Sequence, residues 1–260
     1  YGYTRTVVDS LNYPWQVSVM PGKLWAAFTD TNNLKVKRLD MITNEVTDIY
    51  TGDWRIRGAC GHLSKEEMFI VEDGHGIYRY DLTAMAQAAS TSKSTLLADG
   101  IVTKIKDETD GYWRGCAMSK DGYLMFQNLN KKIFELDTAD PATMFEHQLS
   151  KRATTSAYSP DNNYIYYTTS DADGLWKKLR RPVNSVSINL AGPSPAFIGI
   201  SGLAFSADGN SLYVGGSAHI KKIDLTLATD DSNYITVFAG PDTNEYGQHG
   251  LADGLPDTAE

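Results

Sequence analysis

The chain has 260 residues, of which 42% are hydrophobic and 22% charged, and its formal net charge is -8 at pH 7. An acidic chain repels phosphate backbones, so the composition argues against general nucleic-acid binding. No apolar run reaches the roughly 18 residues of a membrane-spanning helix, and no apolar core of a secretory signal is present. The first residue is Tyr1, so we expect a processed form or a fragment.

A short apolar strand that ends in an acidic residue recurs along the chain. The strand ends at Asp40, Asp81, Asp137 and Asp224, and a degenerate copy ends at Arg180. Neighbouring copies are roughly 41 to 56 residues apart, close to the 40–50-residue period of four-stranded β-propeller blades. The spacing therefore predicts tandem blades.

Two further motifs recur with the same spacing as the first. Turn sequences of the Ser-x-Asp type begin at Ser119, Ser159 and Ser206, and a β-rich run follows each of them. A small-residue motif such as Ala191-Gly192 closes most copies but is lost near Leu149. A β-sandwich with regular turns is the alternative, but sandwiches do not repeat side-chain identity at matching offsets.

We therefore expect an all-β fold, a single β-propeller domain over residues 1–260 with five complete four-stranded blades and part of a sixth. The predicted blades cover residues 14–52, 53–100, 111–151, 153–192 and 198–240, while 1–13 and 241–260 belong to a sixth blade or to ring closure. In the second blade, the alanines of Leu82–Ala89 favour a short helix, and the Ser/Thr-rich Ser90–Thr95 predicts a flexible link. Each third strand should bury one apolar residue between blades, namely Leu39, Tyr80, Leu136, Leu179 and Ile223.

The segment from Phe238 to Glu260 resembles the passage between blades in NHL-repeat proteins. The matching positions are Ala239, Gly240, Gly247, Gly250, Asp253, Gly254 and Ala259. The blades themselves lack the Asp-x-x-Asn-x-x-Ile pattern of that family. The resemblance implies that another blade follows, and that Thr4–Val8 is an isolated strand that closes a six-bladed ring. The alternative is a five-bladed ring with a loose tail, and closure of either ring would remove exposed sheet edges.

Two similar loops, Gly52–Gly58 and Asp110–Gly115, precede innermost strands of the predicted propeller. They should gather aromatic and arginine side chains, the types enriched at binding hot spots, near the mouth of the channel. These candidate binding residues are Trp54, Arg55, Arg57, Tyr112, Trp113 and Arg114. In the alternative interpretation they pack blade against blade, and the arginines satisfy backbone carbonyls.

We expect no metal, no cofactor and no catalytic residue. Among the histidines His62, His75, His147, His219 and His249, only His62 falls on a predicted innermost strand, so they do not converge. The acidic stretches 171–174 and 242–254 lack the ligand spacing of a calcium loop and favour turns.

The two cysteines, Cys60 and Cys116, fall on neighbouring innermost strands, one residue out of register. Successive residues of a strand face opposite sides, so a disulfide would require distortion. Two free buried thiols are therefore slightly favoured over a disulfide.

These observations favour a non-catalytic interaction or scaffold propeller, a module of a larger extracellular or cell-surface protein. Its expected partners are proteins or neighbouring modules and, less directly, glycans; no nucleic acid and no membrane span are expected. One alternative is a propeller enzyme of the lactonase or lyase type that uses the central channel. Another is a carbohydrate-binding propeller, which exposed Trp and Tyr side chains would suit.

Overall fold

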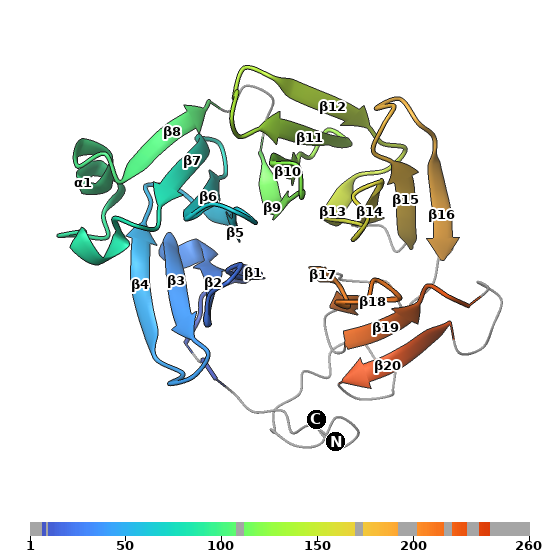
Figure 1. Ribbon diagram of the computed structural model, residues 1–260, viewed down its shortest axis with the longest axis horizontal. Helices are drawn as coiled ribbons and strands as arrows, with labels where there is room; N and C mark the ends of the chain where they lie inside the picture. The colour runs from blue at the N-terminus through green and yellow to red at the C-terminus, as the bar shows by residue number, and fades with distance from the viewer. Residues whose placement is uncertain are drawn as a thin grey trace. The chain divides into compact units, whose positions relative to one another are not determined.

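The computed structural model describes residues 7–8, 10–107, 112–169, 174–191, 202–215, 220–227 and 234–239. Within these residues the chain forms five four-stranded antiparallel sheets, each made of strands consecutive in sequence (Figure 1). This confirms the five predicted blades. The chain divides into two compact units, one of Val8–Gln148 and one of Tyr1–Val7 with Leu149–Glu260.

The unit Val8–Gln148 contains three blades. The first comprises β1 (Pro14–Val19), β2 (Trp25–Asp30), β3 (Lys35–Asp40) and β4 (Val46–Thr51). The second comprises β5 (Ile56–Gly61), β6 (Glu67–Glu72), β7 (Gly76–Asp81) and β8 (Val102–Lys106), and the third β9 (Arg114–Met118), β10 (Tyr123–Gln127), β11 (Lys132–Asp137) and β12 (Met144–Gln148). The unit also has short helical turns η1 (Thr31–Asn33) and η2 (Met85–Gln87) and helix α1 (Lys93–Ala98). The first strands of the blades lie side by side, with β5 between β1 and β9.

The other unit contains two blades. They comprise β13 (Ala153–Tyr158), β14 (Tyr164–Thr169), β15 (Leu175–Leu179) and β16 (Ser187–Ala191), then β17 (Gly202–Phe205), β18 (Ser211–Gly215), β19 (Ile220–Asp224) and β20 (Ile235–Ala239). In both units the cores lie between neighbouring blades: one apolar cluster joins the first and second blades, another the second and third, and another the fourth and fifth. In the described part of the chain, no helix has the length and apolar character needed to cross a membrane.

The repeated acidic residue at the end of the third strand builds the next turn. The Oδ1 atom of Asp81 accepts the backbone N–H of Thr83 at 2.8 Å, and Oδ1 of Asp224 accepts that of Thr226 at 3.0 Å. Hydrogen bonds from the side chain and backbone of these threonines lower the pKa of both carboxyl groups. Asp residues that cap their own turn in this way recur in proteins, so this repeat reflects turn chemistry rather than ligand binding.

The Ser-x-Asp motif closes the hairpin between the first two strands of a blade. Ser159 Oγ donates to Asp161 Oδ1 at 2.5 Å and accepts the backbone N–H of Tyr164 at 2.9 Å. The fifth blade repeats this arrangement with the corresponding residues Ser206, Asp208 and Ser211. The predicted turns are confirmed, and their side chains explain why the motif repeats.

In the fourth blade the predicted core position is wrong by one residue. Ile165 pairs with Lys178, as Leu124 pairs with Leu136 in the third blade, so Lys178 occupies the buried position. Lys178 is 1% exposed and its Nζ donates to the carbonyl of Val183 at 2.9 Å, whereas Leu179 is 42% exposed. Among the other predicted positions, Tyr80, Leu136 and Ile223 are buried and Leu39 is half-buried.

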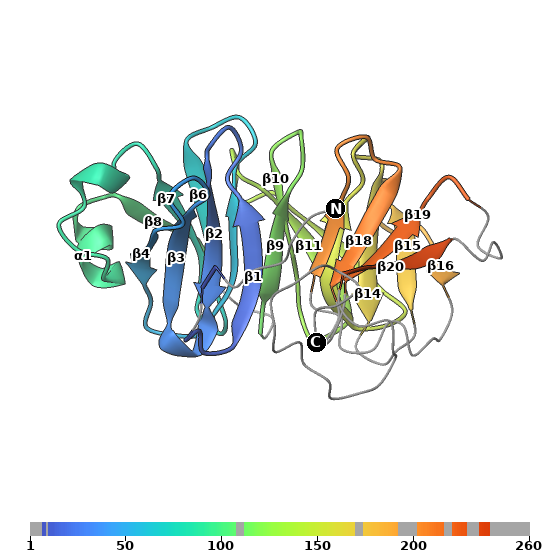
Figure 2. The same cartoon turned by 90° about the horizontal axis from the view of Figure 1, so that it is seen from below.

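The insert in the second blade also differs from expectation. Helix α1 begins inside the segment predicted as a flexible link, and Ser92 Oγ caps it by accepting the backbone N–H of Thr95. The segment Leu82–Ala89 forms only the single turn η2. The fourth strand follows at β8, beyond the predicted blade end at residue 100. Figures 1 and 2 both place α1 beside β8, at the edge of this blade.

A partly buried ionic cluster anchors α1. Lys93 Nζ lies 2.8 Å from Glu72 Oε2 and 2.6 Å from Asp53 Oδ2, and the hydroxyl of Tyr50 donates to Glu72 Oε1 at 2.8 Å. Burial opposes the charge of Lys93, but the hydrogen bonds to Asp53 and Glu72 outweigh it and raise the pKa to about 12. The helix is therefore held by contacts to residues distant in sequence.

The predicted sixth blade is not supported. Val7 and Val8 are described and form no strand, and the rest of the predicted strand Thr4–Val8 lies outside the described residues. The passage from Gly240 to Glu260, which carries most of the resemblance to NHL repeats, also lies outside them.

Candidate functional site

Two of the predicted binding residues meet over an aromatic ring. The guanidinium carbon Cζ of Arg57 lies 4.6 Å from the ring centroid of Trp15, and that of Arg114 lies 5.4 Å from it. The ring of Tyr13 lies 5.8 Å from that of Trp15. Cations at these distances are attracted to the face of an aromatic ring. We call Tyr13, Trp15, Arg57, Asp73 and Arg114 the arginine–aromatic cluster.

A buried ion pair forms the base of this cluster. Arg57 Nε lies 3.1 Å from Asp73 Oδ2, and Asp73 is 3% exposed. Its other oxygen, Oδ1, is buried and has no hydrogen-bond partner among the described residues. Leaving a buried carboxylate oxygen unpaired costs free energy. This oxygen is therefore the strongest sign that the cluster receives a ligand or water.

Bulges at the starts of the first strands aim these side chains. The pairing register shifts at Trp15 and Gln16 in β1, at Arg57 in β5 and near Gly115 in β9. In β1, the backbone N–H groups of Trp15 and Gln16 both donate to the hydroxyl of Thr29. A bulge bends a strand and re-aims its side chains, so the same irregularity in three strands accounts for the cluster.

A glutamine side chain ties β1 to β9. Gln16 Nε2 donates to the carbonyl of Cys116 at 2.6 Å, and the backbone N–H of Cys116 donates to Gln16 Oε1 at 2.9 Å. Gln16 therefore satisfies both backbone polar groups of Cys116, at the bulge of β9.

A disulfide ties β5 to β9, which corrects the expectation of two free thiols. Cys60 and Cys116 are bonded, with their Cα atoms 6.0 Å apart. The two strands come this close because glycines face each other: a Cβ on Gly58 would lie 2.9 Å from the carbonyl carbon of Gly115. In the sequence alignment of the two strands, Cys60 and Cys116 are offset by one residue. The close approach of the two backbones, which the alignment does not reveal, compensates for this offset.

The other predicted site residues lie apart from the cluster centre. Trp54 is exposed, with its ring centroid 5.2 Å from that of His75, and Arg55 and Tyr112 are also exposed. Trp113 is fully buried in the core against Phe126. Trp113 therefore packs between the second and third blades, as the alternative interpretation states.

Four residues of the site or beside it were not predicted from sequence: Tyr13, Trp15, Gln16 and Asp73. A signal was present for the aromatic pair, because Tyr13 and Trp15 stand just before or at the start of a first strand, like Trp54 and Tyr112. No local pattern marked Asp73, which lies in the hairpin after β6 and whose backbone N–H donates to the carbonyl of Arg55 at 2.8 Å.

Within the described ranges, no group of three or more His, Cys, Asp or Glu side chains is placed to hold a metal ion. His62 Nδ1 accepts the backbone N–H of Ser64, and burial followed by the charge of Lys65 lowers the pKa of its imidazole. His147 pairs with Glu135 at 2.7 Å, both fully buried. His219 and His249 lie outside the described residues.

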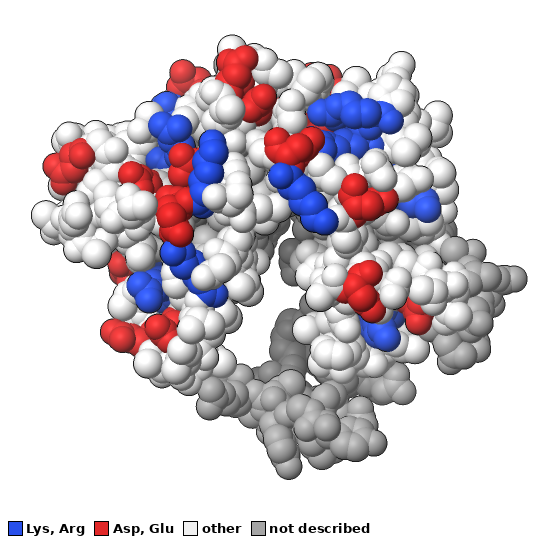
Figure 3. All heavy atoms as spheres, viewed as in Figure 1, with Lys and Arg blue, Asp and Glu red and all other residues white. Residues whose placement is uncertain are grey.

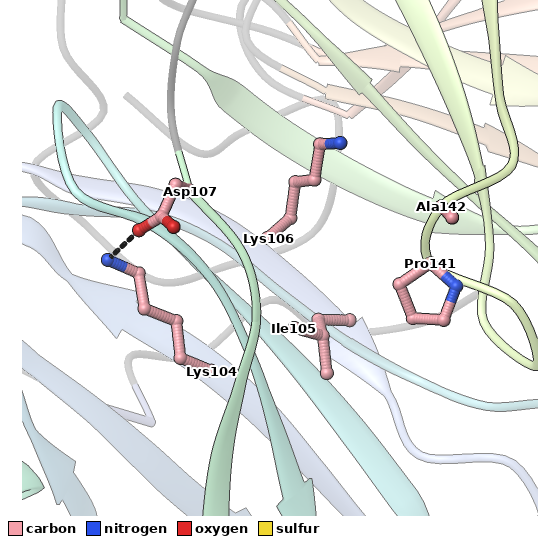
Figure 4. A pocket seen from close by; sticks show the side chains of 6 residues that line it. All are labelled: Lys104, Ile105, Lys106, Asp107, Pro141 and Ala142. Atoms are coloured by element: carbon pink, nitrogen blue, oxygen red, sulfur yellow. Dashed lines mark ion pairs between the residues drawn. The ribbon is translucent and has the colours of Figure 1, made fainter.

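Two clefts border the second blade, and no cluster residue lines either of them. One of about 470 Å³ lies between β8 and the turn before β12 (Figure 4), with Lys104 paired to Asp107 at 2.5 Å. Its lining residues are Lys104, Ile105, Lys106, Asp107, Pro141 and Ala142. The other, of about 320 Å³, is lined largely by charged residues such as Lys65, Arg79 and Asp81. Figure 3 shows basic and acidic side chains interspersed over this blade, so its face carries no large patch of one sign.

No protein-family description matches the chain, and no curated protein matches it by sequence. Solved structures do share its fold. A gluconolactonase from Xanthomonas campestris matches 85% of this chain and 75% of its own, with 13% identity and a TM-score of 0.67. A protein provisionally assigned as a gluconolactonase matches 86% and 79%, with 12% identity and a TM-score of 0.67.

An auxiliary nutrient-binding protein from Bacteroides thetaiotaomicron also matches, with 14% identity and a TM-score of 0.66. The match covers 94% of this chain but only 60% of that protein. At these identities the likeness shows the fold, an all-β propeller with four-stranded antiparallel blades. It overturns the expectation of a non-catalytic scaffold, because the structures that share this fold include gluconolactonases, which are enzymes.

Proposed function

We propose that the chain is a propeller enzyme of the lactonase type, which hydrolyses a small sugar-derived cyclic ester at the arginine–aromatic cluster. The likeness to gluconolactonases supports the reaction class. The observation that carries the site is the buried Asp73, which is paired with Arg57 through one oxygen and unpaired at the other.

Hydrolysis of a lactone adds water across an acyl C–O bond. The water oxygen attacks the carbonyl carbon, the ring C–O bond breaks, and the ring oxygen leaves as a hydroxyl group. Asp73 Oδ1 would take the proton of the attacking water and return it to the leaving oxygen, which is general base and then general acid catalysis. Because Asp73 is buried, its interactions with the reacting atoms are weakly screened.

The arginines would stabilise the charge that develops on the carbonyl oxygen. Arg57 uses Nε for Asp73, and its terminal nitrogens make no hydrogen bond within the described part of the chain. Guanidinium groups form strong hydrogen bonds to anionic oxygens, and donors aimed at a developing oxyanion lower the barrier. The same groups would bind the carboxylate of the hydroxy-acid product, while Trp15 and Tyr13 offer flat apolar faces to the sugar ring.

A second candidate function is carbohydrate binding without turnover. The exposed rings of Tyr13 and Tyr112 and the likeness to a nutrient-binding protein favour it. It uses the same cluster but gives no role to the unpaired oxygen of Asp73.

The test is hydrolysis of five- and six-membered aldonolactones, followed by acid release and corrected for spontaneous opening. The wild-type chain should accelerate opening, and Asp73→Asn should lower kcat by about 100-fold or more at a temperature where the variant is still folded, because loss of one charge of a buried ion pair also destabilises the chain. Asp107→Asn, an exposed carboxylate on the same unit, is the matched control and should retain activity. Saturable sugar binding without hydrolysis would support the second candidate, and neither activity would reject both.

Membership of the NHL-repeat family stays a proposal, supported by the sequence from Phe238 to Glu260. An extracellular or cell-surface location and a protein partner are also proposals. The bond between Cys60 and Cys116 supports the location, because disulfides persist in oxidising compartments.

A further inference from the structure

The contact between Gln16 and Cys116 joins residues 100 positions apart and lies beside the arginine–aromatic cluster. Gln16 follows Trp15 on β1, and Cys116 comes two residues after Arg114 on β9. The two hydrogen bonds, of 2.6 and 2.9 Å, therefore connect the strand that carries the aromatic ring to the strand that carries the second arginine.

The bulge of β9 explains why Cys116 needs hydrogen bonds from a side chain. β9 has one extra residue between the pairs Met125–Ala117 and Gln127–Arg114, and Gly115 adopts a positive φ of 58°. Bulged residues leave the regular ladder, and buried backbone groups need other partners. Gln16 supplies them for Cys116, and so fixes the conformation of the bulge from which Arg114 projects.

A second strand, β5, also restrains Cys116. The disulfide from Cys60 holds the side chain of Cys116, and the absent Cβ of Gly58 leaves room for the backbone N–H that Gln16 binds. A Cβ on Gly58 would lie 3.1 Å from that nitrogen. Cys116 is therefore held through its side chain by β5 and through its backbone by β1.

We infer that Gln16 is a positioning residue that holds Arg114 over Trp15 and thereby sets how tightly the cluster binds the anionic oxygen of its ligand. The role of Gln16 in a reaction rests on the proposed lactonase function, whereas its role in positioning Arg114 is independent of that function. Arg57 has its own anchor in Asp73. Loss of the Gln16 contact should therefore shift Arg114 relative to Trp15 and leave Arg57 in place.

The first test measures the position of Arg114 relative to Trp15 and does not depend on enzyme activity. Gln16→Met keeps the length of the side chain and removes both hydrogen bonds. In NMR spectra of the arginine Nε–H groups, assigned with Arg57→Lys and Arg114→Lys, the ring current of Trp15 should shift both signals in the wild-type chain. Gln16→Met should move only the Arg114 signal towards the position of an exposed arginine. An unmoved Arg114 signal would overturn the inference.

The second test uses turnover of aldonolactones. Gln16→Met and Arg114→Lys should lower kcat/KM by similar factors, and the double variant should lose little more, because residues that act through one another are not additive. Full additivity would contradict the inference. Gln148→Met, a glutamine on β12 with an exposed 3.4 Å contact to the carbonyl of Lys131, is the matched control and should behave as wild type. If the wild-type chain hydrolyses no lactone while the Arg114 signal still moves, the proposed function fails and the positioning role stands.

Discussion

Gly58 and Gly115 face each other across two neighbouring first strands, so closely that a methyl group on Gly58 would lie 2.9 Å from the carbonyl carbon of Gly115. This contact brings β5 within disulfide distance of β9 and places the strands that carry Arg57 and Arg114 side by side. The geometry of the candidate site therefore depends on direct contact between the backbones of two glycines.

Gly58→Ala should destabilise the protein by about 1–3 kcal/mol, because the added methyl group must push the backbone of β9 away. Equilibrium urea unfolding would measure the change. Gly202→Ala is the control, since Gly202 also lies in a first strand but, chain neighbours aside, no atom of the described residues lies within 4 Å of its added Cβ. Equal stability of Gly58→Ala and wild type would show that the strands are further apart than described.

Loss of the disulfide should also be costly. It joins residues 56 positions apart, and a cross-link over a loop of that length contributes about 2–4 kcal/mol, chiefly by restricting the unfolded chain. Replacing both cysteines by alanine should lower the unfolding free energy by that amount. In the wild-type chain, unfolded without reductant, a thiol reagent should find no free thiol; two reactive thiols would contradict the bond.

The corrected register of the fourth blade predicts a contrast between two leucines. Leu136→Ala should cost about 2–5 kcal/mol, because it opens a cavity at a fully buried position. Leu179→Ala should change stability by less than about 0.5 kcal/mol, because this side chain is exposed and surface substitutions are usually near neutral. Thermal melts of both variants would distinguish the register of the structure from the register predicted from sequence. A large loss of stability in Leu179→Ala would support the register predicted from sequence.

The cluster below α1 predicts weakening at alkaline pH. The folded-state pKa of Lys93 is raised to about 12 from an ordinary value of 10.5. The stabilisation is thus complete below about pH 10.5 and is lost as the pH rises through 12. Burial followed by the charge of Glu72 raises the pKa of Tyr78, which acts with the same sign from about pH 10 upwards.

Urea unfolding at pH 9 and pH 11.5 would measure this loss. The double variant Lys93→Met with Glu72→Gln removes the paired charges together, and its stability should fall less over the same interval. An equal fall in both proteins would show that other groups carry the alkaline sensitivity.

The five sheets were predictable because their signals are local. Asp81 and Asp224 make turns with residues two positions away, and Ser159 closes a hairpin of a few residues, so the repeat is visible in the sequence. The fourth blade was misaligned by one residue because Leu179 stands where the other third strands have aspartate. Without that marker, the sequence offers no local signal for the register.

The remaining features depend on contacts between distant segments. The helix α1 was missed because its anchor, Lys93, is held by Glu72 and Asp53. In the candidate site, Arg57 and Arg114 were predicted from their similar loops. Asp73 was not, because it reaches Arg57 through a hairpin whose side chains carry no repeated pattern.

The covalent link between Cys60 and Cys116 also determines how the chain would respond to mechanical force. Tension applied at the two ends would pass through the sulfur bridge, so the segment between the two cysteines would carry no load. That segment contains β6, β7, β8 and α1, most of the second blade. Stretching the oxidised chain should therefore release a contour shorter by roughly 190 Å than stretching the reduced chain, at about 3.4 Å per residue.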